Sequence, residues 1–567
     1  MKRALLAGAM LVALAPPATG QEPDRGTVVV EMALASLDDL LSLPSFRTLA
    51  AHGGGALMNG RADVEAELNE VLFDEHGHVI RRPGLIPMRV SDLGVDPGAV
   101  ASLVEDALAN VRGPTLVLVV SREPFSRTAR QGDELGAVIA AWLDDPADVL
   151  NADGTITTTD AEPRALTSDS TRRAGVVATV DPAATLAEWL DLPYDAGAPI
   201  RTTDEPAPLD LYRRYLEQRR LAVPVQAISW SLMGVAGIAG LLALRRRRHA
   251  SDRTLAWAGA LVATLPWLAL ALLLVGHLPS LTVWTVTPFL VGSTAAGVAA
   301  SRWVAERRGI LAALAFTGLV ILAALALEAS TGWQAAVTPL AGGGQLDGGR
   351  FFGMGNAEIG LVLGAAMFVV HRISTRAGVA LLIGCALVVG SPWTGANFGA
   401  AITLFATAGL WLGVRDDRPW WWTLLSTGAV TAIGMAVIAV MHRYLTAHAT
   451  HVTTFLERSG GVTGGVDRFV DRLGVGFDLL ADSPFSILPV LGTIVLLVIV
   501  LRPPPAIAES FEGRDAWRDA VLVLVLGSIV AYLANDTGAA ALGFGFGAAL
   551  SGLLDVSLAT GREKMRR

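Results

Sequence analysis

The chain has 567 residues, of which 52% are hydrophobic and 17% charged, and its formal net charge is −8. Soluble globular proteins usually contain about 25% charged residues, so this composition indicates a membrane protein, and the negative charge argues against a nucleic-acid partner, which would need a basic face. Cys385 is the only cysteine, which excludes intrachain disulfides and cysteine-ligated metal sites.

Residues 1–20 have the pattern of a secretory signal peptide. Lys2 and Arg3 precede an apolar stretch of about a dozen residues, and small residues follow at Ala18 to Gly20. The stretch is short for a membrane span, although an uncleaved signal anchor is the alternative. In either case we expect the chain after Gln21 to be exported.

Residues 21–209 are predicted to form an exported, doubly wound α/β domain. The β-branched runs 27–32 and 115–121 are typical of buried parallel strands. Helices are expected over 95–111, with Asp96 as N-cap and Pro97 at the first position, and over 134–145. Residues 175–193 are expected to form a strand, a turn at Asp181-Pro182 and a helix, and alternation of strand and helix favours an α/β fold. A polar helical connector, 210–221, follows.

Residues 222–567 are predicted to form an all-α polytopic membrane domain of about eleven transmembrane helices. Basic residues follow every odd-numbered apolar run, from Arg245–Arg248 after the first to Lys564, Arg566 and Arg567 after the last. The positive-inside rule then places those ends and the C-terminus in the cytoplasm and the N-terminal domain outside the plasma membrane. The apolar runs lie at 222–244, 254–276, 281–300, 310–328, 357–371, 378–391, 398–414, 421–441, 486–501, 518–534 and 539–556.

With that topology, unusual polar residues gather at the outer face. They lie in the segments DGGRFFGMGNAE (347–358), SPWTGANFG (391–399) and ANDTG (534–538), and in the outer loop 442–485. Ionisable groups near hydrocarbon are unfavourable unless they pair or line a polar cavity, and the accompanying glycines allow close backbone approach. A shared outer-face site is one interpretation, and ordinary helix caps and solvated loops are the other. The candidate site residues are Arg350, Asn356, Glu358, Asn397, Asn535 and Asp536.

Weaker signals favour structural roles. Ser168, Ser170 and Thr171 beside Arg172 and Arg173 would suit a phosphate, but a cap or loop role is favoured. The segment DEHGH (74–78) is interpreted as a hairpin turn rather than a metal site. His442, His448 and His451 are expected to be solvated rather than ligands.

Residues 21–209 resemble the alkaline phosphatase superfamily. The resemblance rests on VVVEMALASLDDL, LAAHGGGALMN and LTSDSTRRAGVVATVDPAATLAEWLDLP. The last segment is similar to the one in which the superfamily has Asp-x-x-Pro-Thr, here Asp181 to Thr185. The membrane half is similar to that of uncharacterised bacterial membrane proteins with GGRFFGMGN, GAN and NDTG motifs, and the domain order is also similar to that of glycolipid ethanolamine-phosphate transferases.

The superfamily's chemistry requires two metal ions held by Asp and His and a Ser or Thr nucleophile. Glu31 stands where the first Asp ligand would be, and no Ser or Thr occurs between Asn59 and Ser91. No histidine lies between His78 and His249. The resemblance therefore implies a degenerate relative without metal or other cofactor, in which phosphatase-type catalysis is not expected.

Three functions are left open. The first is a non-catalytic exported domain on a membrane unit that handles an envelope lipid or a lipid-linked glycan at the outer leaflet. The second is a membrane-embedded transferase, with Glu358 or Asp536 as base and Arg350 or an arginine of the 442–485 loop holding a pyrophosphate. The third, a transporter, is disfavoured because polar residues are scarce at the span centres, where transport sites usually lie.

Overall fold

The computed structural model divides the chain into two compact units, which we describe separately. The first takes in the described residues up to Leu216 and Phe352, and the second begins at Glu217. The structure describes residues 26–33, 37–59, 68, 71, 85–90, 97–111, 113–122, 136–171, 173–178, 180–192, 194, 197–340, 352–445, 484–535 and 538–566.

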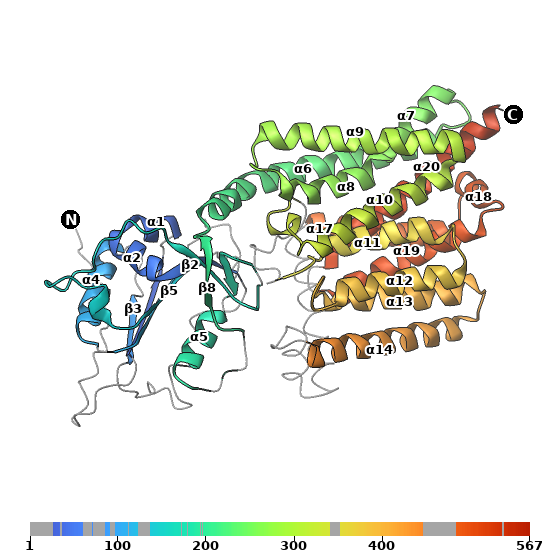
Figure 1. Ribbon diagram of the computed structural model, residues 1–567. Coiled ribbons are helices and arrows are strands. Elements are labelled where there is room, and N and C mark those ends of the chain that lie inside the picture. The colour runs from blue at the N-terminus through green and yellow to red at the C-terminus, as the bar shows by residue number, and fades with distance from the viewer. Residues whose placement is uncertain are drawn as a thin grey trace, which may run out of the picture. The chain divides into compact units, whose positions relative to one another are not determined.

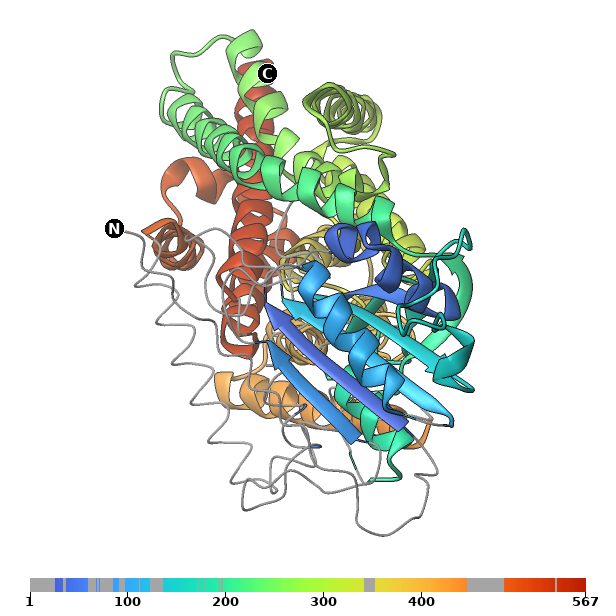
Figure 2. The same cartoon turned by 90° about the vertical axis from the view of Figure 1, so that its left-hand side faces the viewer.

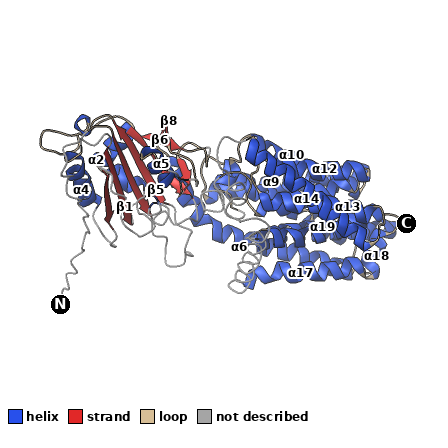
Figure 3. Ribbon diagram, turned by 90° about the horizontal axis from the view of Figure 1, so that it is seen from below, coloured by secondary structure: helices blue, strands red, loops and turns tan. Residues whose placement is uncertain are grey.

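The first unit is built on a mixed sheet of eight strands, in the order β3-β1-β4-β5-β2-β6-β8, with β7 paired to β2. Figures 2 and 3 show the strands side by side. β1 is parallel to both β3 and β4, which confirms the prediction of buried parallel strands at 27–32 and 115–121. The strands are β1 (Gly26–Ala33), β2 (Gly53–Asn59), β3 (Leu85–Val90), β4 (Thr115–Arg122), β5 (Gly136–Leu143), β6 (Arg164–Thr167), β7 (Val176–Ala178) and β8 (Arg201–Pro206).

The prediction of a helix over 134–145 is wrong, because residues 136–143 form β5. This strand lies between β4 and β2 and is antiparallel to both. Its residues 137–141 are all buried, so neither face is left for water. A short apolar run with β-branched residues can form either a helix or a strand. Here the strand is stabilised by pairing with the backbone groups of its two neighbours, β4 and β2.

Helices lie on both faces of this sheet (Figure 1). Leu186 and Ala187 of α5 (Asp181–Trp189) share a core with Leu118, Val120 and other residues of one face. On the opposite face, Leu37 of α1 (Leu37–Ser42) packs against Gly55. The expected strand, turn and helix over 175–193 are confirmed as β7 and α5. The remaining helices are α2 (Pro44–His52) and α4 (Pro97–Ala109), and the Asp96 N-cap proposed for α4 lies outside the described residues.

The second unit is helical. Its elements are α6 (Leu209–Arg245), α7 (Asp252–Val262), α8 (Thr264–Leu274), η2 (Val275–His277), α9 (Val283–Arg308), α10 (Ile310–Ser330), η3 (Ala335–Val337), α11 (Ala357–Val370), α12 (Thr375–Gly390), α13 (Phe398–Arg415), α14 (Trp420–Tyr444), α17 (Pro484–Leu501), α18 (Pro505–Phe511), α19 (Asp515–Ala534) and α20 (Gly538–Arg566). The predicted connector 210–221 is not separate from the first span, because α6 runs through both without a break.

Among the described residues, eight helices are long and apolar enough to cross a membrane. A ninth candidate is the pair Ile487–Leu501 and Pro505–Phe511, which is bent by 68°. Two shorter apolar helices, Glu358–Val370 and Thr375–Gly390, complete the set. Each predicted apolar run falls on one of these helices, so the chain is built as a multi-pass membrane protein, while a count of eleven crossings stays a prediction.

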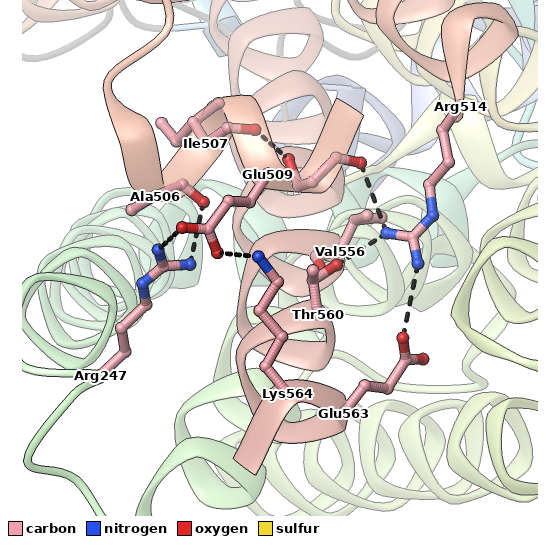
Figure 4. Close-up of polar contacts among 10 residues, drawn as sticks. Arg247, Ala506, Ile507, Glu509, Arg514, Val556, Thr560, Glu563 and Lys564 are labelled. Atoms are coloured by element: carbon pink, nitrogen blue, oxygen red, sulfur yellow. Dashed lines mark hydrogen bonds and ion pairs between the residues drawn. The ribbon is translucent and has the colours of Figure 1, made fainter. Parts of the chain in front are cut away.

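Basic side chains at one end of the helical unit are tied to acidic ones. Figure 4 shows Glu509 of α18 between Arg247 (2.6 Å) and Lys564 (2.9 Å). Arg514 lies 3.6 Å from Glu563 and donates to Thr560 Oγ1. Further pairs at this end are Arg302–Asp555, Arg415–Asp519 and Arg562–Asp252. We call this the basic end. It includes the ends of α6, α9, α13 and α20 and the starts of α7 and α19.

Candidate functional site

The opposite end of the helical unit gathers the candidate residues that the structure describes. Here α10, α12, α14 and α19 end and α11 and α13 begin. We call this the asparagine end, because Asn356, Asn397 and Asn535 mark the boundaries of three of these helices.

Asn397 is the centre of the arrangement. Its Oδ1 caps α13 by accepting a hydrogen bond from Ala400 N at 2.9 Å. Its Nδ2 donates toward Met354 O (3.1 Å), Gly355 O (3.3 Å) and Asn356 Oδ1 (3.3 Å). The side chain is fully buried, so one amide joins the start of α13 to the segment before α11.

Glycine brings the two backbone segments together. Met354 N donates to Gly395 O at 2.9 Å. Gly353 has φ +88°, and a Cβ on it would lie 1.9 Å from Gly395 O. A side chain at Gly353 would therefore be both strained and excluded by backbone, which agrees with the close approach expected of these glycines.

Asn535 reaches the same cluster from α19. Its Nδ2 donates to Ala531 O at 2.8 Å, and its Oδ1 lies against Gly399 in the first turn of α13. A Cβ on Gly399 would be 2.1 Å from that oxygen. The end of α19 thus packs directly on the start of α13, two residues beyond Asn397.

Glu358 supplies the ionisable group. It is buried and lies in the first turn of α11, where the partial positive charge of a helix N-terminus favours a carboxylate. The carboxylate lies over the backbone of Gly355, since a Cβ there would be 2.6 Å from Glu358 Oε2. Asn356, Glu358, Asn397 and Asn535 therefore form one group, which we call the Asn–Glu cluster.

The structure adds a second acidic group at this end that the sequence analysis missed. Glu328, at the end of α10, is buried, and its Oε1 pairs with His277 Nε2 while its Oε2 accepts from Ala335 N at 2.9 Å. Trp333 joins Glu328 to the segment before α13, because its backbone N donates to Glu328 O and its Nε1 to Thr394 O. The available signal was Glu328 itself, an ionisable residue at the end of an apolar run.

His442 differs from expectation. We expected a solvated side chain, but it is buried and its Nε2 lies 2.9 Å from Gly390 O, at the end of α12. A histidine in the last turn of a long apolar helix packs inward here because a backbone carbonyl offers it a partner.

Two of the six candidates cannot be placed. The side chains of Arg350 and Asp536 lie outside the described residues, as do His448, His451 and most of the loop 442–485. For the other four, both interpretations have support. Asn397 is a helix cap, yet the cluster also holds a buried carboxylate and amide groups that can exchange hydrogen bonds with a hydroxyl or phosphate. The assignment of a site to these residues stays a hypothesis.

In the first unit, the hydroxyl-rich segment 168–171 binds the protein's own Asp181. Ser168 Oγ and Ser170 Oγ donate to its carboxylate at 2.5 and 2.7 Å. Ala178 N and Ala198 N donate to the same carboxylate at 2.6 and 3.0 Å. Thr171 Oγ1 donates to Val176 O at 2.5 Å. The favoured loop role fits these residues better than a phosphate site, because their hydroxyls are already engaged.

Burial raises the pKa of Asp181 to about 6, against the opposing effect of the four hydrogen bonds, each of which favours the ionised form. The carboxylate is therefore charged at neutral pH and inaccessible to solvent.

Within the described residues, no group of three or more His, Cys, Asp and Glu side chains is placed to hold a metal ion. The side chain of Glu31 and the segment 74–78 lie outside that description. Comparison of the chain with protein-family models, with curated proteins and with solved structures gives no match.

Proposed function

We propose that the protein handles an envelope lipid or a lipid-linked glycan at the outer leaflet of the plasma membrane, through the asparagine end. The Asn–Glu cluster carries this proposal. It places a buried carboxylate among amide groups at helix boundaries. The polar groups of lipids lie at this depth of a bilayer, whereas transported ions are usually bound near mid-membrane.

The orientation belongs to the same proposal. The basic end, with Arg247, Arg415 and Lys564, would face the cytoplasm by the positive-inside rule. The Asn–Glu cluster would then lie at the extracytoplasmic side, together with the N-terminal unit, which a signal peptide over residues 1–20 would export.

For the N-terminal unit we propose a non-catalytic relative of the alkaline phosphatase superfamily. Two observations support a structural rather than a catalytic role for this unit. Helices cover both faces of its mixed sheet, and the segment from Asp181 to Thr185, which carries much of the resemblance, is engaged internally. Thr185 Oγ1 donates to Asp181 O and accepts from Ile200 N.

Substitution Glu358→Gln tests the function while keeping the shape of the side chain. In the source organism we expect it to mimic loss of the protein, because removing charge from a buried binding group weakens recognition by on the order of tenfold to a hundredfold. The readout is the profile of envelope lipids and lipid-linked glycans, together with the amount of protein in the membrane.

Glu306→Gln is the matched control, because Glu306 is exposed at the end of α9, and it should leave the profile unchanged. An unchanged profile in Glu358→Gln at normal protein level would refute the proposal. Accumulation of an unmodified acceptor would instead favour the transferase, and retention of an intact lipid on the inner leaflet would favour the transporter.

A further inference from the structure

A pocket lies at the basic end, lined by residues from the end of α6, the start of α7 and the turn between them. Figure 1 shows where these two helices lie. Its volume is about 570 Å³, within the range of sites that hold small molecules. It lies in the helical unit at the end away from the Asn–Glu cluster, so an inference from it does not depend on the proposed function.

The packing of the two helices explains the space. α6 and α7 are in close contact at Gly240, where a Cβ would lie 2.7 Å from Val262. Toward the helix ends, four of the lining residues are alanines, which leave the volume between the helices unfilled. The turn that joins them is fixed by hydrogen bonds such as His249 N to Arg246 O (2.8 Å), so the pocket is preformed.

The pocket lining has an apolar part and a polar part. Leu242, Leu261 and Trp257 supply an apolar surface, and Leu242 and Trp257 are exposed. Arg246 supplies a cationic group and His249 an imidazole just beyond the end of α6. An exposed Trp next to arginines at a helix end is typical of the boundary between hydrocarbon and headgroups.

The Arg246 guanidinium of the pocket is available to a ligand. The nearby acids are bound elsewhere, since Asp252 pairs with Arg562 and Arg566 and Glu509 pairs with Arg247 and Lys564. Within the described residues, no ion pair involves Arg246 or His249. Exposed Arg245, Arg248 and Arg253 add positive charge around them.

From this geometry we propose that the α6–α7 pocket binds an anionic phospholipid of the adjacent leaflet. The phosphodiester would lie on the Arg246 guanidinium, whose planar donors suit phosphate oxygens. One acyl chain would follow Leu242 and Leu261 into the bilayer. Basic pockets between helices bind anionic headgroups in this manner.

The test measures lipid binding to the full-length protein in detergent by native mass spectrometry. Phosphatidylglycerol and phosphatidylcholine with identical acyl chains are titrated separately. We expect phosphatidylglycerol to bind more tightly, and Arg246→Glu to weaken it by at least about fivefold, since each basic residue contributes roughly that factor at an anionic surface.

Arg308→Glu is the matched control, because Arg308 is an exposed arginine at the end of α9 that does not line the pocket. It should change binding by less than about twofold. Arg246→Gln removes the charge without reversing it and should give an intermediate loss. Equal losses in Arg246→Glu and Arg308→Glu would show only general surface attraction and overturn the proposal. Equal binding of the two lipids, or displacement of phosphatidylglycerol by inorganic phosphate, would overturn it as well.

Discussion

Substitution Asp181→Ala is expected to unfold much of the N-terminal unit. The carboxylate accepts four hydrogen bonds in a fully buried position, two from backbone N–H groups and two from serine hydroxyls. The hydroxyls can rotate to other acceptors, but Ala178 N and Ala198 N cannot, and a buried donor without an acceptor costs about 1–3 kcal/mol. A loss of about 3–5 kcal/mol follows, a large share of the 5–15 kcal/mol that stabilises an ordinary domain.

The measurement is hydrogen exchange and limited proteolysis of the full-length protein across residues 176–200. Two variants calibrate it. Ser170→Ala removes one of the four donors and should cost about 1 kcal/mol. Asp160→Ala changes an exposed aspartate of the same unit and should leave exchange unaltered. Wild-type exchange in Asp181→Ala would show that the carboxylate does not hold this region together.

The same aspartate should make the stability of the N-terminal unit depend on pH. Its pKa is about 6 in the folded protein, against an ordinary value of 3.8 for an aspartate, because burial disfavours the charge. The folded state therefore binds the proton more tightly. The contribution of this group, about 3 kcal/mol, is fully present below pH 3.8 and is lost as the pH rises through 6. Unfolding of wild type and Asp181→Asn between pH 4.5 and 7.5 isolates it, and parallel curves would contradict it.

The sequence predicted those elements whose residues favour one structure by themselves. The β-branched residues that fill most of β1 and β4 favour a strand over a helix, and the polar boundaries of the long apolar runs mark most helix ends. The run from Gly136 to Leu143 is different, because alanine and valine at these positions suit either a helix or a strand. Its secondary structure depends on β4 and β2, which flank it in the sheet although both precede it in the chain.

The same distinction applies to the candidate site. Glu358, Asn397 and Asn535 were found because each is a polar residue beside an apolar run. The contact between Trp333 and Thr394 joins residues 61 positions apart, and no local pattern predicts it. Glu328 and His277 were missed for a related reason, since each looks like an ordinary helix-end residue until the fold brings them together.

Substitution Asn397→Ala is expected to loosen the asparagine end. It removes the cap of α13, which contributes about 1 kcal/mol, and a side-chain donor to Met354 O and Gly355 O. With two carbonyl groups losing that donor at a buried position, the total loss should be about 3 kcal/mol. Thermal unfolding in detergent and hydrogen exchange over residues 352–360 measure it.

Two replacements at Asn397 separate the cap from the donor. Asn397→Ser can keep the cap and should recover about 1 kcal/mol relative to alanine. Asn397→Asp has nearly the shape of asparagine and also keeps the cap, but it turns an acceptor toward Met354 O, Gly355 O and Asn356 Oδ1. It should therefore be less stable than Asn397→Ala. Ser374→Ala, which removes a cap from α12 at the other end of the helical unit, should cost no more than about 1 kcal/mol. If Asn397→Asp is as stable as wild type, the donor contacts of Nδ2 do not join α13 to the segment before α11, and the Asn–Glu cluster loses its structural centre.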